Sequence, residues 1–213
     1  MPDAAELTQR WIAAWVHVRS IEVSQLDGWP LVHTRSRTRE TELICRDPGP
    51  EAFTALMRHI DGDPRAMLTV IAEDIEPYAA LELPPGVRVD RHDETLMTVE
   101  LKPGDPPLHD SDLMSRWDIH GNSVTLRLET DDSVAAEGTI GVLGDVAVFD
   151  AIETSPKFRR RGLGRCVVSM LNSYALDRGA STGILAATSQ GRMLYESLGW
   201  DVALNMRSLM GAR

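Results

Sequence analysis

Apolar residues recur every three or four positions in several stretches, which is the spacing of a helix with one buried face. Leu7, Trp11 and Trp15 follow this spacing near the start of the chain. Gly179 and Gly199 come directly after two later stretches, and a left-handed glycine commonly ends a helix. The pattern predicts helices over residues 5–18, 51–60, 111–117, 162–178 and 189–198.

Short apolar runs separated by Gly, Pro and Asp predict strands between these helices. The turn Asp131-Asp132-Ser133 and the pair Gly144-Asp145 divide residues 124–154 into an antiparallel meander of strands. Gly28-Trp29-Pro30 and Pro84-Pro85-Gly86 are expected to be turns. The strands are expected at 66–72, 96–101, 124–130, 135–142, 145–154, 184–187 and 202–210, with two short ones within 31–46.

Residues 102–108 are rich in Pro, Gly and Asp, and we place a boundary there between an N-terminal lobe, residues 1–101, and a second lobe, residues 102–213. A strand, then Tyr78-x-x-Leu81 and a glycine, occurs in the first half. The second half has the same order with Tyr195-x-x-Leu198. Either the first half is a degenerate copy of the second, or the shared order is a coincidence between ordinary successions of strands, helices and turns in an α/β protein.

The composition is that of a globular protein in water, with 43% hydrophobic and 25% charged residues. No apolar run reaches the roughly 18 residues of a membrane span, and the acidic start lacks a secretory signal. Cys45 and Cys166 are too few for a disulfide framework, so we expect a cytoplasmic protein. Cys166 is expected to be a small buried apolar residue rather than a reactive thiol.

The net charge of −10 argues against nucleic-acid binding, because affinity for phosphates comes from basic surface. It mildly favours a cationic partner such as an amine. The histidines have no metal-ligand spacing, so we expect no metal. A homodimer is left open. The histidines are His17, His33, His59, His92, His109 and His120.

The most informative motif is Arg159-Arg160-Arg161-Gly162-Leu163-Gly164, between the strand 145–154 and the helix 162–178. Glycine lets the backbone approach a ligand closely. A helix start offers N–H groups and a partial positive charge, and arginines add further positive charge. We interpret the loop as a pyrophosphate site. The plainer alternative is a basic turn before an amphipathic helix.

Residues 146–200 resemble the acyl-CoA core of the GNAT N-acetyltransferase superfamily. They contain Ile152-Glu153-Thr154 at a strand end, Ser155-Pro156, Arg159-x-x-Gly162-x-Gly164 and Leu194-Tyr195-x-x-x-Gly199-Trp200. The resemblance implies an α/β (α+β) fold with a mixed, mainly antiparallel sheet flanked by helices. It implies acetyl transfer from acetyl-CoA directly to a primary amine. The implied contacts to acetyl-CoA are Ile152, Glu153, Thr154, Arg159, Arg160, Arg161, Gly162, Leu163, Gly164, Arg165 and Tyr195.

The resemblance also implies that Tyr195 is the general acid that protonates the departing thiolate. Asp150 and Glu153 are candidate bases, and strand alternation predicts that they point to opposite faces. Where relatives carry a glutamate on this strand, the chain has Val148, which puts a dedicated base in doubt. A backbone N–H within 152–154 is expected to stabilise the oxyanion. Weaker candidates for the base are Asp145, Glu137 and Glu129.

About 20 residues separate Leu101 from Asn122, where the family usually has two helices that shape the acceptor pocket. The pocket is therefore shortened, or the first half supplies a wall. A non-catalytic acyl-CoA-binding regulatory module is the main alternative function. The motifs of other nucleotide-phosphate sites are missing from the chain. There is no Gly-Lys-Ser/Thr of a Walker-type loop, and Val167 stands where a dinucleotide-binding loop has its third glycine.

Overall fold

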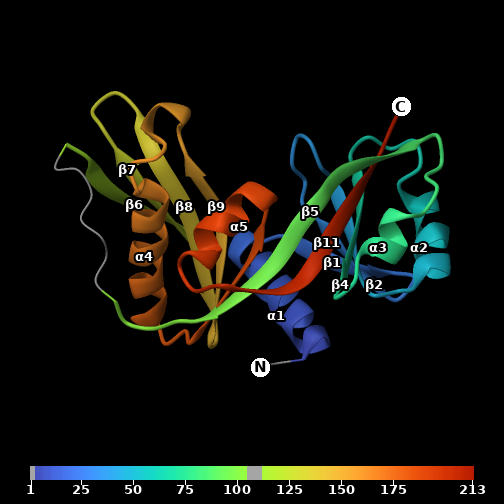
Figure 1. Ribbon diagram of the computed structural model, residues 1–213, viewed down its shortest axis with the longest axis horizontal. Helices are drawn as coiled ribbons and strands as arrows, with labels where there is room; N and C mark the ends of the chain where they lie inside the picture. Colours follow the sequence, from blue (N-terminus) through green and yellow to red (C-terminus); the bar gives the residue numbers. More distant parts are fainter. Residues whose placement is uncertain (1–2, 105–111) are drawn as a thin grey trace.

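The computed structural model describes residues 3–104 and 112–213. The strands form a single sheet in the order β1-β2-β3-β4-β11-β5-β10-β9-β8-β7-β6 (Figure 1). The helices are α1 (Ala4–Arg19), α2 (Pro50–Leu56), α3 (Glu76–Ala79), α4 (Leu163–Leu176) and α5 (Ser189–Glu196), with 3-10 turns at Met57–His59 and Pro156–Phe158. The strands are β1 (Glu22–Leu26), β2 (Trp29–His33), β3 (Thr41–Arg46), β4 (Ala66–Ala72), β5 (Val87–Glu100), β6 (Met114–His120), β7 (Ser123–Glu129), β8 (Val134–Leu143), β9 (Val146–Thr154), β10 (Thr182–Ala187) and β11 (Asp201–Gly211).

The sheet is mixed and mainly antiparallel, as expected from the sequence. Among the described strands, only two neighbouring pairs run parallel, β3 with β4 and β9 with β10. Each parallel pair is joined through a helix, α2 in the first half and α4 in the second. This is the connection that parallel neighbours require. The fold class predicted from the sequence is therefore confirmed.

The two halves share one order of elements. The first half runs β3-α2-β4-α3-β5 and the second runs β9-α4-β10-α5-β11. The final strands are exchanged, because β5 pairs with β10 and β11 pairs with β4. The two final strands also pair with each other in the middle of the sheet. The division into residues 1–101 and 102–213 stays an interpretation of this order.

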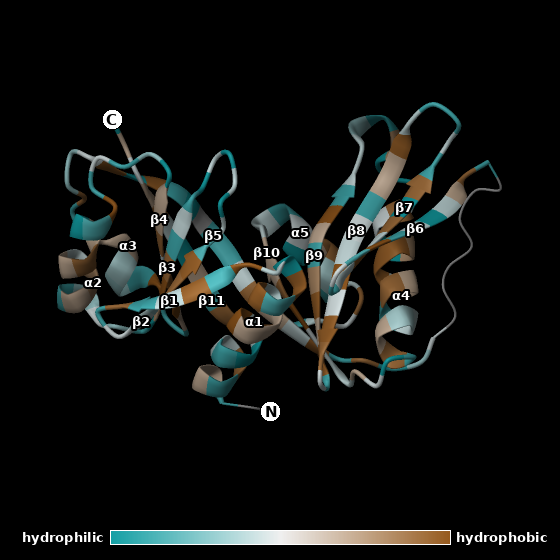
Figure 2. Cartoon of the chain, turned by 180° about the vertical axis from the view of Figure 1, so that it is seen from behind, coloured by the Kyte–Doolittle hydropathy of each residue, from teal (hydrophilic) through white to brown (hydrophobic). Residues whose placement is uncertain are grey.

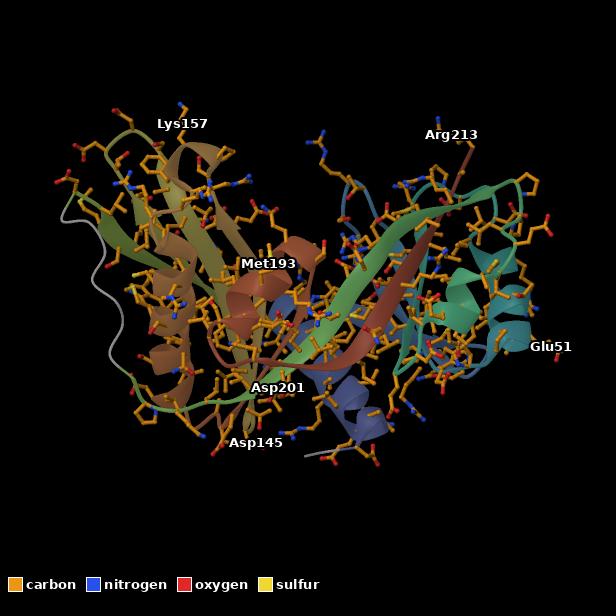
Figure 3. All side chains as sticks on the ribbon, viewed as in Figure 1. Glu51, Asp145, Lys157, Met193, Asp201 and Arg213 are labelled. Carbon is orange, nitrogen blue, oxygen red and sulfur yellow. The ribbon has the colours of Figure 1, made fainter. Side chains whose placement is uncertain are left out.

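Helices α1 and α4 cover opposite faces of the sheet at β9. Ala147 and Phe149 belong to the core that contains α4. Val146 and Val148 alternate with them and pack in the core that contains α1. Figure 2 shows hydrophobic residues recurring along β8, β9 and α4. Asp145, just before β9, and Lys157, just after it, lie far apart in Figure 3, so the loop after this strand is at the opposite end of the strand from Asp145.

The N-terminal helix is defined at both ends. The Glu6 N–H donates to the Asp3 side chain at 2.8 Å, and Ser20 takes the left-handed conformation after the last turn. Trp11 and Trp15 stack with ring centroids 5.6 Å apart. The predicted helix over residues 5–18 is thus confirmed, and its two tryptophans lie in the core.

Two sequence predictions about local structure are wrong. The helix expected over 111–117 is absent from its described part, where residues from Met114 onward form β6, paired with β7 at the sheet edge. The backbone hydrogen bonds of this short segment are made to the neighbouring strand β7. The spacing of apolar residues within the segment does not reveal such a pairing. Trp29 and Pro30 belong to β2 rather than to a turn, and the turn is Asp27-Gly28. Strand β1 was not predicted.

Candidate functional site

The site lies where the parallel strands β9 and β10 diverge. They pair only from Val146 to Val148 against Thr182 to Ile184, although β9 continues to Thr154. Crevices beyond the carboxyl ends of neighbouring parallel strands are common ligand sites. A cavity of about 480 Å³ lies here, lined by β9, the end of β10, α5, α1 and parts of β3 and β5.

Strand β9 contains a bulge just after Val148, its last residue paired with β10. Asp150 pairs with Thr139 and Glu153 with Glu137, so Ala151 and Ile152 lie opposite the single residue Gly138. Ala151 has φ +50°, a conformation that L residues rarely adopt. A side chain at Gly138 would meet Ile152 and Val167 at 2.4 and 2.7 Å, so a larger residue there would force these two side chains to move.

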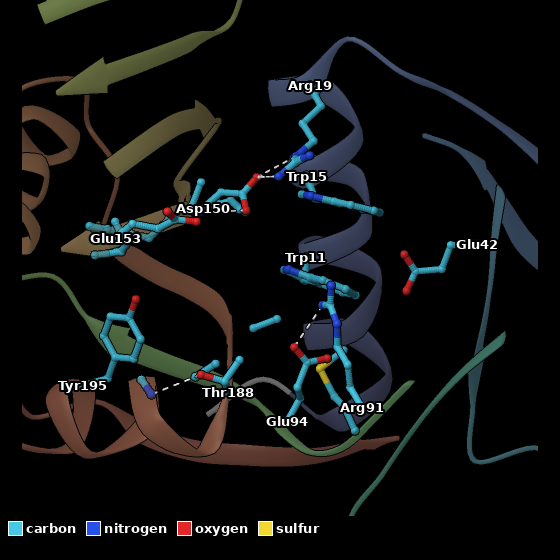
Figure 4. Close-up of a pocket in the computed structure, with 18 of the residues that line it drawn as sticks. Trp11, Trp15, Arg19, Glu42, Arg91, Glu94, Asp150, Glu153, Thr188 and Tyr195 are labelled. Atoms are coloured by element: carbon cyan, nitrogen blue, oxygen red, sulfur yellow. Dashed lines mark hydrogen bonds and ion pairs between the residues drawn. The ribbon is translucent and has the colours of Figure 1, made fainter. Parts of the chain in front are cut away.

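The bulge corrects the prediction that Asp150 and Glu153 point to opposite faces. An inserted residue reverses the alternation of side chains along a strand. Both carboxylates therefore line the same cavity, as Figure 4 shows. Sequence spacing could not reveal this, because the left-handed residue is an alanine rather than a glycine.

The two candidate bases differ in their contacts. Arg19, the last residue of α1, donates from Nε to Asp150 Oδ2 at 2.6 Å, and the Ala151 N–H donates to the other Asp150 oxygen at 2.9 Å. Glu153 is exposed. Both Asp150 oxygens thus have donors, and Asp150 holds α1 against the bulge.

The weaker candidates for the base lie outside the cavity. Asp145 is at the opposite end of β9 and pairs with Arg10 at 2.7 Å. Glu137 pairs with Arg127 at 3.1 Å. Val148, the residue at the expected position of a glutamate, is buried and lines the cavity.

Tyr195 lies on α5, within the helix expected over residues 189–198. The Thr188 hydroxyl caps this helix by accepting from the Gly191 N–H at 3.2 Å. The Tyr195 ring is buried against Trp200, with centroids 5.7 Å apart, and the residue also lines the cavity (Figure 4). Burial, and secondarily the negative charge of Asp150, raises the pKa of Tyr195. Its hydroxyl therefore keeps its proton at neutral pH.

The glycine loop joins β9 to α4. Arg160 and Gly162 have φ of +63° and +77°, and alternating left-handed residues turn successive N–H groups toward one concavity. No side chain caps the start of α4, and its first turn has no acidic residue. Gly164 packs closely, because an added Cβ would lie 3.1 Å from Leu194. The loop has the backbone features of an anion site.

The arginines of the loop differ in their surroundings. Arg159 donates to the Thr154 carbonyl at 3.3 Å, and Arg161 lies over the Phe158 ring at 5.4 Å. Arg165 donates to the Ser197 hydroxyl at 3.0 Å. Leu163 is buried in the core, so only its backbone is available to a ligand. Arg159, Arg160, Arg161 and Arg165 are all exposed around the start of α4.

The first half supplies one wall of the cavity, which was one of the two arrangements expected from the short 101–122 segment. Trp11 and Trp15 contribute from α1. Arg39 lies over the Trp15 ring at 5.6 Å and pairs with Glu42 at 2.6 Å. Glu94 of β5 is 6% exposed. Sequence analysis assigned none of these side chains to the site, and Glu94 reaches it only because β5 pairs with β10.

The equivalent loop in the first half keeps the backbone shape but not the charge. Asp47 and Gly49, just before α2, have φ of +43° and +82°, as Arg160 and Gly162 do before α4. Pro50 opens α2 and has no N–H. The Gly49 N–H donates to the Tyr78 hydroxyl at 3.0 Å. The backbone donor at Gly49 is therefore already used, and the one at Pro50 is missing.

Within residues 3–104 and 112–213, no group of three or more His, Cys, Asp or Glu side chains is arranged to hold a metal ion. No helix among these residues is long and apolar enough to cross a membrane. Cys45 and Cys166 are buried. Burial raises the pKa of Cys45 to about 12 and also raises the pKa of Cys166, so neither thiol ionises at neutral pH.

Comparison with known proteins gives matches to acetyltransferases. Residues 134–208 match the model of the family described as FR47-like protein. The chain is 35% identical over 88 residues to the [ribosomal protein bS18]-alanine N-acetyltransferase of Salmonella typhimurium. This match covers 40% of the chain and 60% of the relative's length.

Solved structures with the same fold cover more of the chain. A GCN5-related N-acetyltransferase from Kribbella flavida has a TM-score of 0.67 and 14% identity, over 100% of this chain and 96% of that one. A tandem GNAT protein from the clavulanic acid biosynthesis pathway has a TM-score of 0.54 and 14% identity, over 90% and 82%. A GNAT-family protein from Novosphingobium aromaticivorans, described as a candidate acetyltransferase, has a TM-score of 0.52 and 18% identity. This match covers 77% of this chain and 82% of that one.

The diverging parallel strands, the bulge and the glycine loop agree with these matches. The family model matches residues in the second half, and the Salmonella relative matches 40% of the chain. The structural matches cover both halves. Residues 134–208 therefore match a GNAT-like family in sequence, and the chain has the fold of GNAT N-acetyltransferases.

Proposed function

We propose that this protein transfers an acetyl group from acetyl-CoA directly to a primary amine. The observation that carries the proposal is the cavity at the divergence of β9 and β10, which connects the bulged strand with Tyr195. The glycine loop follows the same strand and begins α4. A pyrophosphate at the loop and a thioester in the cavity would suit the charge and burial of the two places.

The residues present fit a bound acyl-CoA. The uncapped start of α4, the left-handed residues Arg160 and Gly162, and the surrounding arginines favour a pyrophosphate. The thioester supplies an activated acetyl group when it is bound. A backbone N–H within 152–154, at the bulged end of β9, would stabilise the developing oxyanion. Tyr195 holds its proton for the departing sulfur, since its hydroxyl is protonated at neutral pH.

The acceptor would enter from the side of the first half. This wall carries Trp11, Trp15 and two buried carboxylates, Glu42 and Glu94. Tryptophans and carboxylates together favour a cationic amine with an apolar body. The Salmonella relative is named for acetylation of an alanine of a ribosomal protein, so a peptide with a free N-terminal alanine belongs among the acceptors to be tried.

The experiment is to measure release of the CoA thiol from acetyl-CoA with a panel of primary alkylamines and peptides with a free α-amine. We expect amine-dependent release, with a product heavier by one acetyl group in mass spectrometry. Binding of acetyl-CoA without turnover of any amine would favour the regulatory module instead. Absence of binding would contradict both functions.

A further inference from the structure

The cavity holds two buried carboxylates, Glu42 and Glu94, to which the chemistry proposed so far assigns no proton transfer. Glu94 lies on β5, directly opposite Met206 of β11. The next residue, Thr95, pairs with Ala187, the last residue of β10. The strand exchange therefore brings Glu94 of the first half to the point where β9 and β10 diverge, and its side chain lines the same cavity as Tyr195 (Figure 4).

We propose that Glu94 accepts the proton that the acceptor ammonium must lose before its nitrogen attacks the thioester. This inference rests on the proposed function. An alkylammonium with a pKa near 10.4 is almost entirely charged at neutral pH, so its lone pair must be released by a base. The second half has Val148 where the resemblance implies a glutamate, and the first half supplies a carboxylate from across the cavity.

The contacts of the other carboxylates favour Glu94. Glu42 pairs with Arg39, whose side chain is only 16% exposed, and accepts from the Thr69 hydroxyl at 2.7 Å. Asp150 has donors on both oxygens. Glu94 pairs with Arg91 at 3.0 Å, and Arg91 is 47% exposed. Arg91 has solvent to move into when a cationic acceptor arrives, whereas Arg39 is packed over Trp15.

Electrostatics support the same assignment. Burial raises the pKa of Glu94 above its usual value, and the nearby charge of Glu42 raises it further, while Arg91 and Arg39 lower it. A carboxylate with a raised pKa is a better proton acceptor. The other charged or titratable groups around the cavity are Arg19, Asp150, Glu153 and Tyr195.

The step balances with the residues in place. One N–H bond of the ammonium breaks and its proton goes to the Glu94 carboxylate. The freed lone pair forms the C–N bond, the C–S bond breaks, and the sulfur takes the Tyr195 proton. The second proton on nitrogen returns to the Tyr195 oxygen, and Glu94 releases its proton to solvent. The products are an amide, the CoA thiol and one proton.

The test compares Glu94→Gln, Glu94→Asp and Glu100→Gln with the alkylamine that the wild-type protein acetylates best. Glu100 is a matched control, since it lies on the same strand with an exposed side chain. At pH 7 we expect kcat/KM for the amine to fall by roughly 10²–10⁴ in Glu94→Gln. Glu94→Asp should recover part of the loss, Glu100→Gln should match the wild type, and the affinity for acetyl-CoA should not change.

The pH profile separates a base from a structural residue. Toward about pH 10 the free amine becomes abundant, so the deficit of Glu94→Gln should shrink steadily. A deficit that is equal at all pH values, or full activity in Glu94→Gln, would overturn the assignment while leaving the acetyltransferase function intact. A wild-type protein that acetylates no amine would overturn both.

The melting temperature shows whether Glu94→Gln is folded. The folded-state pKa of Glu94 is raised, so its contribution to stability is fully present below the unfolded pKa and is lost as pH rises through the folded pKa. Replacing this charge with neutral Gln should therefore leave the melting temperature at pH 7 equal to that of the wild type or higher. An inactive variant that melts normally cannot be explained by unfolding.

Discussion

Tyr78 and Tyr195 occupy the same place in the two halves, each on the short helix that follows the second strand of a parallel pair. Their hydroxyls differ. Tyr78 donates to Asp47 Oδ1 at 2.5 Å and accepts from the Gly49 N–H at 3.0 Å, so it closes the first-half loop. Tyr195 lines the cavity of the second half. One position thus has a structural role in one half and a proposed chemical role in the other.

Tyr195→Phe should lower kcat by roughly 10²–10⁴, which is the usual effect of losing a positioned acid. The Michaelis constant for acetyl-CoA should move little, because the hydroxyl acts in the transition state. Burial raises the pKa of Tyr195, so wild-type kcat should not fall as pH rises to about 9. Steady-state kinetics of both proteins test this, and a near-normal kcat in the variant would return Tyr195 to a packing role.

Tyr78→Phe is the matched substitution in the first half, and the opposite outcome is expected. It leaves Asp47 and the Gly49 N–H without their partner, which should cost about 1–3 kcal/mol of unfolding free energy. The value of kcat should not change, because Tyr78 lies outside the cavity that Tyr195 lines. Denaturant unfolding and turnover assays measure the two effects. A loss of kcat with unchanged stability would contradict the structural role of Tyr78.

Ala151→Gly should be tolerated or should stabilise the protein, since a left-handed conformation costs an L residue roughly 1–2 kcal/mol. Ala147→Gly, in the regular part of the same strand, should destabilise it by about 1 kcal/mol, through chain entropy and a lost methyl group. Chemical denaturation gives both values. Equal destabilisation by the two substitutions would mean that Ala151 does not adopt φ +50° in solution.

Asp150→Asn should reduce kcat by less than about tenfold, because both oxygens of Asp150 already have donors and its role is to hold α1 against the bulge. The Arg19–Asp150 pair is partly exposed, so its coupling energy should be about 1 kcal/mol or less. A double-mutant cycle with Arg19→Gln measures this coupling. A loss of 10²-fold or more in Asp150→Asn would make Asp150 the proton acceptor in place of Glu94.

The sequence predicted the parts of the fold that depend on local pattern. The long helices, the meander into β9 and the glycine loop follow from periodicity, turn residues and residue order, and the resemblance to the GNAT superfamily rests on them. The bulge at Ala151 could not be predicted, because no glycine marks it. Glu94 could not be assigned to the cavity, because its place depends on β5 inserting between β10 and β11, a pairing between distant segments.

We predict that the loop at 159–164 binds acetyl-CoA and that the equivalent loop at 47–50 does not. Isothermal titration of acetyl-CoA into the wild-type protein, Gly164→Glu and Gly104→Glu tests it most directly. Gly104 has open space around it, so it controls for the added charge. We predict one site per chain in the wild type and in Gly104→Glu, and no binding to a folded Gly164→Glu. Two sites per chain, or unchanged affinity in Gly164→Glu, would contradict the claim.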